Sequence, residues 1–348
     1  MEILNNIRDK ILVIQTAFPG DAILSLPMIR KLKEMNMDSI IDVLCTPQTR
    51  DIFKLAPYIN EIIVIDKKGE HRSLLNFIYF SRMLKKRSYA RIYSPHRSFR
   101  TAFMILQSGI RESYGFTNSS FSHVYKYLID YKIEHHEVQR GFDLIGYNYN
   151  ADGWKILPEI TIPPSVEQKI ADYLKDNIND SAFAVIAPGS IWATKKYPLE
   201  HFKAIIKYLI SLNLKVIIIG GKDEEETGNV LTIEFKGSLV SAAGKFTFAE
   251  SIALLKHAVI LISNDSAPAH LGLCADIPVL TLYCSTIPGF GFYPYNKKSR
   301  WLSISDLDCK PCGIHGYNKC PLNHFLCGNK LEAGMVIPTI KEILNVPN

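Results

Sequence analysis

Short apolar runs alternate with amphipathic stretches along the chain, and this alternation predicts an α/β fold. In the first half we expect buried strands near 10–15, 40–44, 62–65 and 90–93. In the second half we expect them near 183–187, 215–219, 239–241, 258–262 and 278–283. Because the segments between these runs have helical character, the sheets should be parallel with helices on both faces.

The helix predicted after Pro198 shows this character most clearly. A helix is also predicted over 22–35. Apolar side chains recur after Pro198 at the spacing of one helix face: Phe202, Ile205, Ile206, Leu209 and Ile210. Repeated in both halves, the pattern predicts two Rossmann-like, doubly wound domains that face each other across a cleft.

The length of the chain also favours two domains, because 348 residues is long for a single core. The boundary is expected around 157–164, where Pro163 and Pro164 stiffen the connector and continue neither neighbouring element. The expected domains are 1–164 and 165–330. The helix-like segment 331–348 is expected to pack back on the first domain.

A polar turn follows the apolar run 259–263, and its residues suit an anion. The turn holds Asn264, Asp265, Ser266, Ala267, Pro268, Ala269 and His270. Proline belongs in the first turn of a helix, and Asp265 or Ser266 is expected to cap that helix. The remaining backbone N–H groups and the helix dipole then favour a phosphate.

Two other segments place reactive side chains just past a predicted strand, where open α/β sheets bind ligands. Gly20 and Asp21 follow the first strand, and Asp21 serves either as a helix cap or as a base that takes a hydroxyl proton. Ser190, Thr194 and Lys195 follow the strand at 183–187, and a lysine there either neutralises a diphosphate or is simply solvated.

A glycine pair after the strand near 215–219 gives a nucleoside close access to the backbone. Asp223 and Glu224 follow Gly220 and Gly221, and an acid at this place either binds ribose hydroxyls or stabilises the first turn of a helix. The sequence does not decide which acid contacts a ribose.

Composition and charge narrow the class of protein. The net charge of +6 suits anionic ligands but falls short of a nucleic-acid binder. No apolar run is long enough for a membrane span, and residues 1–6 lack a signal-peptide pattern, so we expect a cytoplasmic protein. An aromatic stretch at 74–80 leads into a basic stretch at 82–91, which either rests on anionic lipid or forms a core helix with a solvated end.

Histidine and cysteine give weaker indications of metal. The neighbours His135, His136 and Glu137 lack the spacing that places two ligands on one helix face, so we expect hydrogen-bonding or surface roles. Four cysteines gather near the end of the chain: Cys309, Cys312, Cys320 and Cys327. Metal binding and reduced structural thiols both fit them, and the absence of a second short pair favours thiols.

Taken together, these motifs resemble the lipopolysaccharide heptosyltransferase family, inverting GT-B glycosyltransferases that use ADP-heptose, and most closely its second subgroup. The motifs that carry the likeness are Gly20-Asp21 with Leu26-Pro27 and Leu32-Lys33, the blocks 188–190 and 195–198, Gly220-Gly221, Asn264-Asp265-Ser266 with Pro268 and His270, Pro278, and the four-cysteine tail. Two positions depart from the family pattern, because Ala267 stands in place of a usual glycine and Tyr197 in place of a common tryptophan.

The resemblance implies a reaction and a role for each segment. Asp21 would be the base that deprotonates the acceptor hydroxyl, and ADP would leave without a required metal or other cofactor. The implied donor-binding residues are Ser190, Thr194, Lys195, Gly221, Asp223, Glu224, Asp265, Ser266, Ala267 and His270, and the acceptor-binding residues are Gly20, Arg97 and Arg100. The acceptor would be the inner core of a lipid A-linked oligosaccharide, reached by a protein held peripherally on the inner face of the cytoplasmic membrane.

Three other interpretations stay open. A glycosyltransferase that uses a different nucleotide sugar for a surface glycan differs only in its substrate. A nucleotide-dependent oxidoreductase is the rival from another class, although residues 15–20 lack the glycine fingerprint of dinucleotide binding. A sugar-binding protein without catalysis is the third, and the presence of both Asp21 and Lys195 weighs against it.

Overall fold

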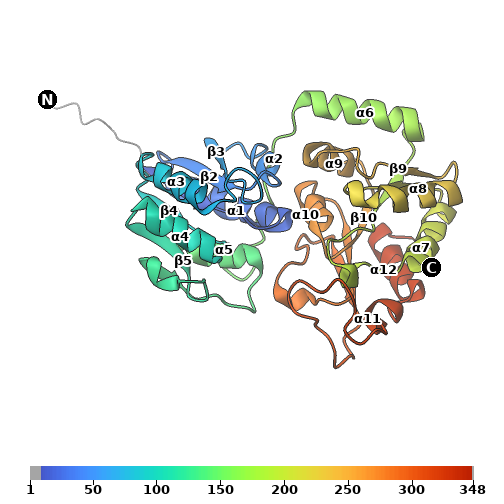
Figure 1. The fold of residues 1–348 in the computed structure, drawn as a ribbon. Helices are drawn as coiled ribbons and strands as arrows, with labels where there is room; N and C mark the ends of the chain where they lie inside the picture. The colour runs from blue at the N-terminus through green and yellow to red at the C-terminus, as the bar shows by residue number, and fades with distance from the viewer. Residues whose placement is uncertain (1–8, 347–348) are drawn as a thin grey trace. The chain divides into compact units, whose positions relative to one another are not determined.

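A computed structural model describes residues 9–346, which excludes the first residues of the chain, on which the absence of a signal peptide was judged. The chain divides into two compact units, Met1–Thr161 and Ile162–Asn348, and each unit contains one six-stranded sheet (Figure 1). Every strand pairing in both sheets is parallel. The predicted α/β class with two doubly wound domains is confirmed.

The first sheet has the strand order β3-β2-β1-β4-β5-β6. Its strands are β1 (Lys10–Ile14), β2 (Ile40–Cys45), β3 (Glu61–Val64), β4 (Arg91–Tyr93), β5 (Glu112–Phe116) and β6 (Tyr127–Ile129). The helices of this unit are α1 (Pro19–Met35), α2 (Arg50–Phe53), α3 (Leu74–Lys85), α4 (Phe99–Ser108) and α5 (Glu137–Ile145). α3 packs beside α4, and both bury side chains against Leu12, Ile14 and Ile92 of the sheet. α1 packs with α5 instead.

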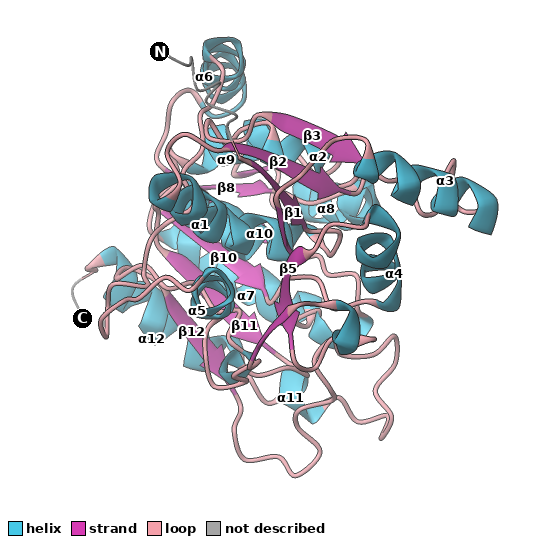
Figure 2. Cartoon of the chain, turned by 90° about the vertical axis from the view of Figure 1, so that its left-hand side faces the viewer, coloured by secondary structure: helices cyan, strands magenta, loops and turns pink. Residues whose placement is uncertain are grey.

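The second sheet repeats this arrangement with the order β12-β11-β10-β7-β8-β9. Its strands are β7 (Phe183–Ala187), β8 (Lys215–Ile218), β9 (Leu239–Ser241), β10 (Ile260–Asn264), β11 (Val279–Tyr283) and β12 (Arg300–Ser303). Its helices are α6 (Pro164–Ile178), α7 (Leu199–Ser211), α8 (Glu225–Glu234), α9 (Phe248–Leu255), α10 (Ala267–Cys274), α11 (Leu326–Asn329) and α12 (Ala333–Leu344), all labelled in Figure 2.

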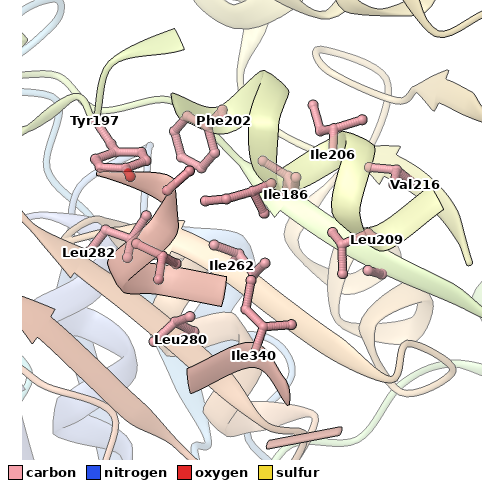
Figure 3. Close-up of a cluster of buried hydrophobic side chains, with 14 of the residues drawn as sticks. Ile186, Tyr197, Phe202, Ile206, Leu209, Val216, Ile262, Leu280, Leu282 and Ile340 are labelled. Atoms are coloured by element: carbon pink, nitrogen blue, oxygen red, sulfur yellow. The ribbon is translucent and has the colours of Figure 1, made fainter. Parts of the chain in front are cut away.

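The core of the second unit forms where α7 and α12 cover the sheet. Phe202, Ile206 and Leu209 of α7 meet Ile262 of β10 and Ile340 of α12 (Figure 3). The periodicity predicted after Pro198 is therefore confirmed. α12 buries one face in the core of the second unit, where it lies against α7. The contact of the last helix with the first domain stays a prediction.

Three strands were not predicted: β5, β6 and β12. β5 begins with two polar residues and contains Gly115, β6 has only three residues, and β12 is half-exposed at a sheet edge. None of them presents a continuous buried run. Within residues 9–346, no helix combines the length and the apolar composition that crossing a bilayer requires.

Candidate active site

In each sheet the strand order reverses once. At that point the chain leaves two neighbouring parallel strands toward opposite edges of the sheet. In the first sheet it lies between β1 and β4, and in the second between β7 and β10. Such switch points are where open α/β sheets bind ligands, beyond the carboxyl ends of the strands. Most of the predicted site residues follow one of these four strands. The sequence alone predicted where these strands end. The strand order then shows that the ends of β1 and β4 are neighbours in the first unit, and those of β7 and β10 in the second.

Asp21 lies in the first turn of α1, just past β1, rather than at the N-cap position, which Phe18 occupies. Burial and, to a smaller extent, the nearby Glu137 raise the pKa of this carboxyl to about 7, against the opposing effect of backbone hydrogen bonds and Arg97. The side chain remains partly exposed, so protein surrounds it without sealing it from solvent. A carboxylate with a near-neutral pKa is suited to remove a proton at physiological pH.

A buried ion pair adjoins Asp21 and was not predicted as part of the site. Glu137, the first residue of α5, pairs with Arg140 at 2.9 Å between Oε2 and Nη1. Arg140 is fully buried and donates to the carbonyl oxygens of Lys132 and Ile133. The guanidinium carbons of Arg97 and Arg140 lie 4.0 and 4.5 Å from the ring centre of Tyr131. These contacts fix both cations and the second carboxylate around Asp21.

The neighbouring histidines have structural roles. His136 is the N-cap of α5 and its side chain accepts a hydrogen bond from the N–H of Val138. His135 contacts Asp143 at 2.9 Å. Hydrogen-bonding roles predicted for this pair are confirmed.

Positive charge collects at the ends of β1, β3 and β4. Lys67 donates to Thr16 at 2.7 Å, and Thr16 in turn contacts Nδ1 of His96 at 2.8 Å. Burial and, to a smaller extent, the nearby Arg100 lower the pKa of Lys67 to about 8. Arg97 and Arg100 were predicted here as acceptor-binding residues, whereas Lys67 was missed because it follows a strand without any local motif. These cations are suited to an anionic group.

In the second unit, Lys195 and Asp265 come together from the ends of β7 and β10. Nζ of Lys195 lies 2.6 Å from Oδ2 of Asp265, and the hydroxyl of Thr286 donates to the same oxygen at 2.7 Å. Asp265 is therefore not the helix cap that the sequence suggested. Ser266 occupies the N-cap position of α10, but its side chain makes no capping bond, so the predicted side-chain cap is wrong.

Asn264 connects the two loops that carry these residues. Its side chain donates to the carbonyl of Pro188 at 2.7 Å and accepts from the N–H of Tyr197 at 3.0 Å. It is completely buried, so both bonds are shielded from water. The asparagine was noticed in sequence as part of a motif, but its role as a connector emerges only from the fold. Tyr197 itself belongs to the core, where its hydroxyl donates to the carbonyl of Leu331.

The start of α10 offers hydrogen-bond donors to an anion. Ala267 is the first residue of the helix, with Pro268 directly after it, so the first turn keeps N–H groups without a helical partner. His270 is buried one turn later, and its Nδ1 finds no hydrogen-bond partner in the described chain. Burial lowers the pKa of His270 to about 4, which keeps the imidazole neutral. A neutral imidazole is able to donate or accept a hydrogen bond.

The structure separates the two acids after Gly221. Glu224 accepts from the N–H of Gly221 at 3.0 Å and lies so close to Gly189 that a Cβ there would meet its Cδ at 2.3 Å. Asp223 is exposed. Glu224 is thus the acid that adjoins the loop after β7, where Ser190 and Lys195 lie.

The cysteine-rich segment contacts the same loop. The hydroxyl of Thr194 donates to the carbonyl of Tyr317 at 3.0 Å and accepts from its N–H at 2.8 Å, so this side chain is engaged within the protein. The N–H of Cys312 donates to the carbonyl of Ser285 at 2.8 Å. All seven cysteines are free thiols, and across residues 9–346 no three His, Cys, Asp or Glu side chains are arranged to hold a metal ion.

The sequence profile of glycosyltransferase family 9 (heptosyltransferase) matches residues 78–318. Lipopolysaccharide heptosyltransferase 3 of Escherichia coli is 25% identical over 295 residues, which cover 77% of this chain and 82% of that protein. Lipopolysaccharide heptosyltransferase 2 of Escherichia coli K12 is 24% identical over 334 residues, covering 89% of this chain and 90% of that protein.

The fold agrees with these sequence relationships. The solved structure of the Escherichia coli ADP-heptose lipopolysaccharide heptosyltransferase II superposes with a TM-score of 0.78 at 20% identity. The alignment covers 97% of this chain and 98% of that one, so both sheets are shared. The GT-B fold expected from the sequence is confirmed by this match.

Proposed function

The chain belongs to glycosyltransferase family 9, and on that premise we propose that it transfers heptose from ADP-heptose to the inner core of a lipid A-linked oligosaccharide, with inversion at the anomeric carbon. The single observation that carries the proposed chemistry is the position of Asp21 in the first turn of α1, just past β1, where burial raises the pKa of its carboxyl to about 7. A hydroxyl is a weak nucleophile until a base takes its proton in the transition state.

The proposed reaction is a direct displacement. Asp21 accepts the proton of the acceptor hydroxyl while the hydroxyl oxygen forms a bond to the anomeric carbon of the heptose. The bond between that carbon and the diphosphate oxygen breaks on the opposite side, and ADP leaves. Attack from the side opposite the leaving group inverts the anomeric configuration.

The donor diphosphate is proposed to bind at the switch point of the second sheet. Lys195 would neutralise the diphosphate, and the first N–H groups of α10 at Ser266 and Ala267 would donate to its oxygens. Because Lys195 pairs with Asp265 at 2.6 Å, donor binding must compete with, or add to, that ion pair. These groups would balance the negative charge that develops on the departing ADP, and the proposed reaction uses no cofactor.

The remaining donor contacts follow from their positions. Glu224 is proposed to accept hydrogen bonds from the ribose hydroxyls, since it is the acid beside Gly189 and Gly221. The buried Nδ1 of His270 is proposed to bond the sugar or phosphate. Ser190 lies in the loop after β7, and Thr194 holds that loop in place. Asp223 is proposed to contact the donor only at the periphery of the site.

The acceptor is proposed to bind at the switch point of the first sheet. Gly20 allows close approach to α1, while Arg97 and Arg100, joined by Lys67, would bind the anionic groups of the oligosaccharide. Since lipid A anchors the acceptor in a bilayer, the proposal places the protein peripherally at the inner face of the cytoplasmic membrane.

A transfer assay tests the proposal directly. The purified protein is incubated with ADP-heptose and a heptose-free inner-core acceptor, and the linkage formed is assigned by NMR. We expect release of ADP with a single product of inverted anomeric configuration. Transfer from a different nucleotide sugar would keep the mechanism and change the donor, and a product with retained configuration would overturn the direct displacement.

A further inference from the structure

One segment of the first unit is rich in basic residues and contains no acidic residue of its own. Residues 71–111 contain nine lysines and arginines and no aspartate or glutamate. At the overall frequency of the chain, 34 acidic residues in 348, a segment of this length would contain about four. The segment spans α3, β4 and α4. Its imbalance therefore creates a local positive field that the net charge of the whole chain does not reveal.

Within this segment, α3 presents apolar side chains to solvent. Leu75 is 79% exposed, Tyr79 69% and Met83 38%. Arg82 and Lys86 fall on the same helix face at spacings of three and four residues. We call these five residues the α3 outer stripe. The opposite face of α3 buries Phe77, Phe80 and Leu84 in the core, so the stripe is not needed for folding.

The cations of α3 stand outside the ion pairs of this unit. In the described part of the chain, Arg82, Lys85 and Lys86 form no ion pair, whereas the nearby Arg87 and Arg91 pair with Glu61 and Asp9. The charges of Arg82 and Lys86 thus lie beside exposed leucine and tyrosine with no acid to neutralise them. Large apolar side chains that are this exposed commonly mark an interaction surface.

We propose that the α3 outer stripe docks the protein on an anionic lipid bilayer. Leucine and tyrosine side chains partition into the boundary between headgroups and acyl chains, while cations on the same helix face meet anionic headgroups. A second copy of this chain fits the stripe less well, because a two-fold contact would bring Arg82 and Lys86 against the same cations of the partner. The inference rests on the proposed function and gives it a membrane contact, since the acceptor there is lipid-linked.

Sedimentation with vesicles tests the surface without donor or acceptor. We expect the full-length protein to bind phosphatidylcholine vesicles that contain phosphatidylglycerol, and to bind pure phosphatidylcholine much more weakly. Replacing both cations in Arg82→Ser/Lys86→Ser should weaken partitioning about 30-fold, since each contributes about 1 kcal/mol near an anionic surface. Leu75→Ser/Tyr79→Ser should weaken it by about tenfold or more.

Matched controls lie in the second unit. Val230→Ser/Ile233→Ser removes apolar side chains that are 45% and 80% exposed on α8, and Lys297→Ser/Lys298→Ser removes two exposed lysines. These variants should bind vesicles like the parent. Equal losses in the controls, or unchanged binding of both stripe variants, would overturn the proposal.

Two further measurements separate lipid docking from self-association and from the transfer reaction. Sedimentation velocity without lipid reports self-association, and a loss of dimer in the stripe variants, with vesicle binding intact, would assign the stripe to a second copy and overturn the proposal. Transfer to a deacylated, water-soluble acceptor should be the same in the parent and in the stripe variants. If the parent fails to transfer while vesicle binding follows the stripe, the proposed function fails and the docking surface stands.

Discussion

The two switch points have the same topology, but the carboxyl group at each one has a different electrostatic environment. At the first, no lysine of the described chain pairs with Asp21, and burial together with the neighbouring Glu137 raises the pKa of this carboxyl to about 7. At the second, Asp265 is paired with Lys195 at 2.6 Å and bonded to Thr286 at 2.7 Å. A buried carboxyl that forms no direct ion pair is available to take a proton, whereas a carboxylate held by a lysine orients that lysine.

One architecture thus supports two tasks. Strand order places loops from two different strands beside each other in both units. The side chains on those loops then determine whether the switch point is suited to proton transfer or to anion binding. Duplication of the fold therefore does not duplicate the chemistry, and each proposed role must be tested within its own unit.

The largest effect is expected from Asp21→Asn. Loss of the base should lower kcat for transfer by about 100-fold to 10,000-fold, because general base catalysis contributes that much. The affinity for ADP should be unchanged, since the donor is proposed to bind the other unit. Steady-state kinetics and calorimetry measure the two quantities. The control is Asp51→Asn, which alters an exposed carboxylate of α2 and should have normal turnover. Near-normal turnover in Asp21→Asn would show that Asp21 is not the catalytic base.

Lys195→Ala should weaken ADP binding by about 10-fold to 100-fold, the usual worth of a charge-assisted hydrogen bond. The adjacent Lys196 provides a matched control, because its side chain is 42% exposed and lies 3.7 Å from Glu224. Lys196→Ala should change ADP affinity much less. Calorimetric titration of both variants with ADP measures the two affinities. An equal loss of affinity in both would mean that Lys195 contributes only to the overall positive charge and does not contact the diphosphate.

Asn264→Ala should destabilise the second unit by about 1–3 kcal/mol, because the carbonyl of Pro188 and the N–H of Tyr197 lose their buried partner. Donor affinity should fall as well, since the two loops are no longer connected. Urea unfolding and ADP titration measure these effects. Asn229→Ala, at an exposed position on α8, is the control and should leave both unchanged. A stable Asn264→Ala variant would show that the loops hold together without the connector.

The smallest expected effect is a shift in the pH profile. Because Asp21 acts as a carboxylate, kcat/KM should rise with pH through a midpoint near 7. Glu137→Gln removes a negative charge that raises the pKa of Asp21, so the midpoint should move to lower pH. The same substitution leaves Arg140 without its carboxylate partner, which acts in the same direction. A midpoint that moved to higher pH would contradict the proposed coupling between the two carboxyls.

The sequence predicted the central strands and the residues at their ends, because buried parallel strands appear as apolar runs and polar turns follow them. It missed β5, β6 and β12, whose short or half-exposed patterns resemble loops.

Around the site it missed Lys67, Glu137 and Thr286. Each of these reaches the strand ends from a distant element and has no motif of its own. Such partners become visible only when the strand order is known. It also could not choose between Asp223 and Glu224, which the packing against Gly189 distinguishes.

A calorimetric comparison of ligands tests the central claim most directly, using ADP-heptose, ADP, UDP, GDP, CMP and NAD with the parent protein, Lys195→Ala and Asp21→Asn. The account predicts selective binding of ADP-heptose and ADP, weakened by Lys195→Ala and unaffected by Asp21→Asn. Binding of NAD alone, or ADP binding that depends on Asp21 and not on Lys195, would contradict the division of labour between the two switch points.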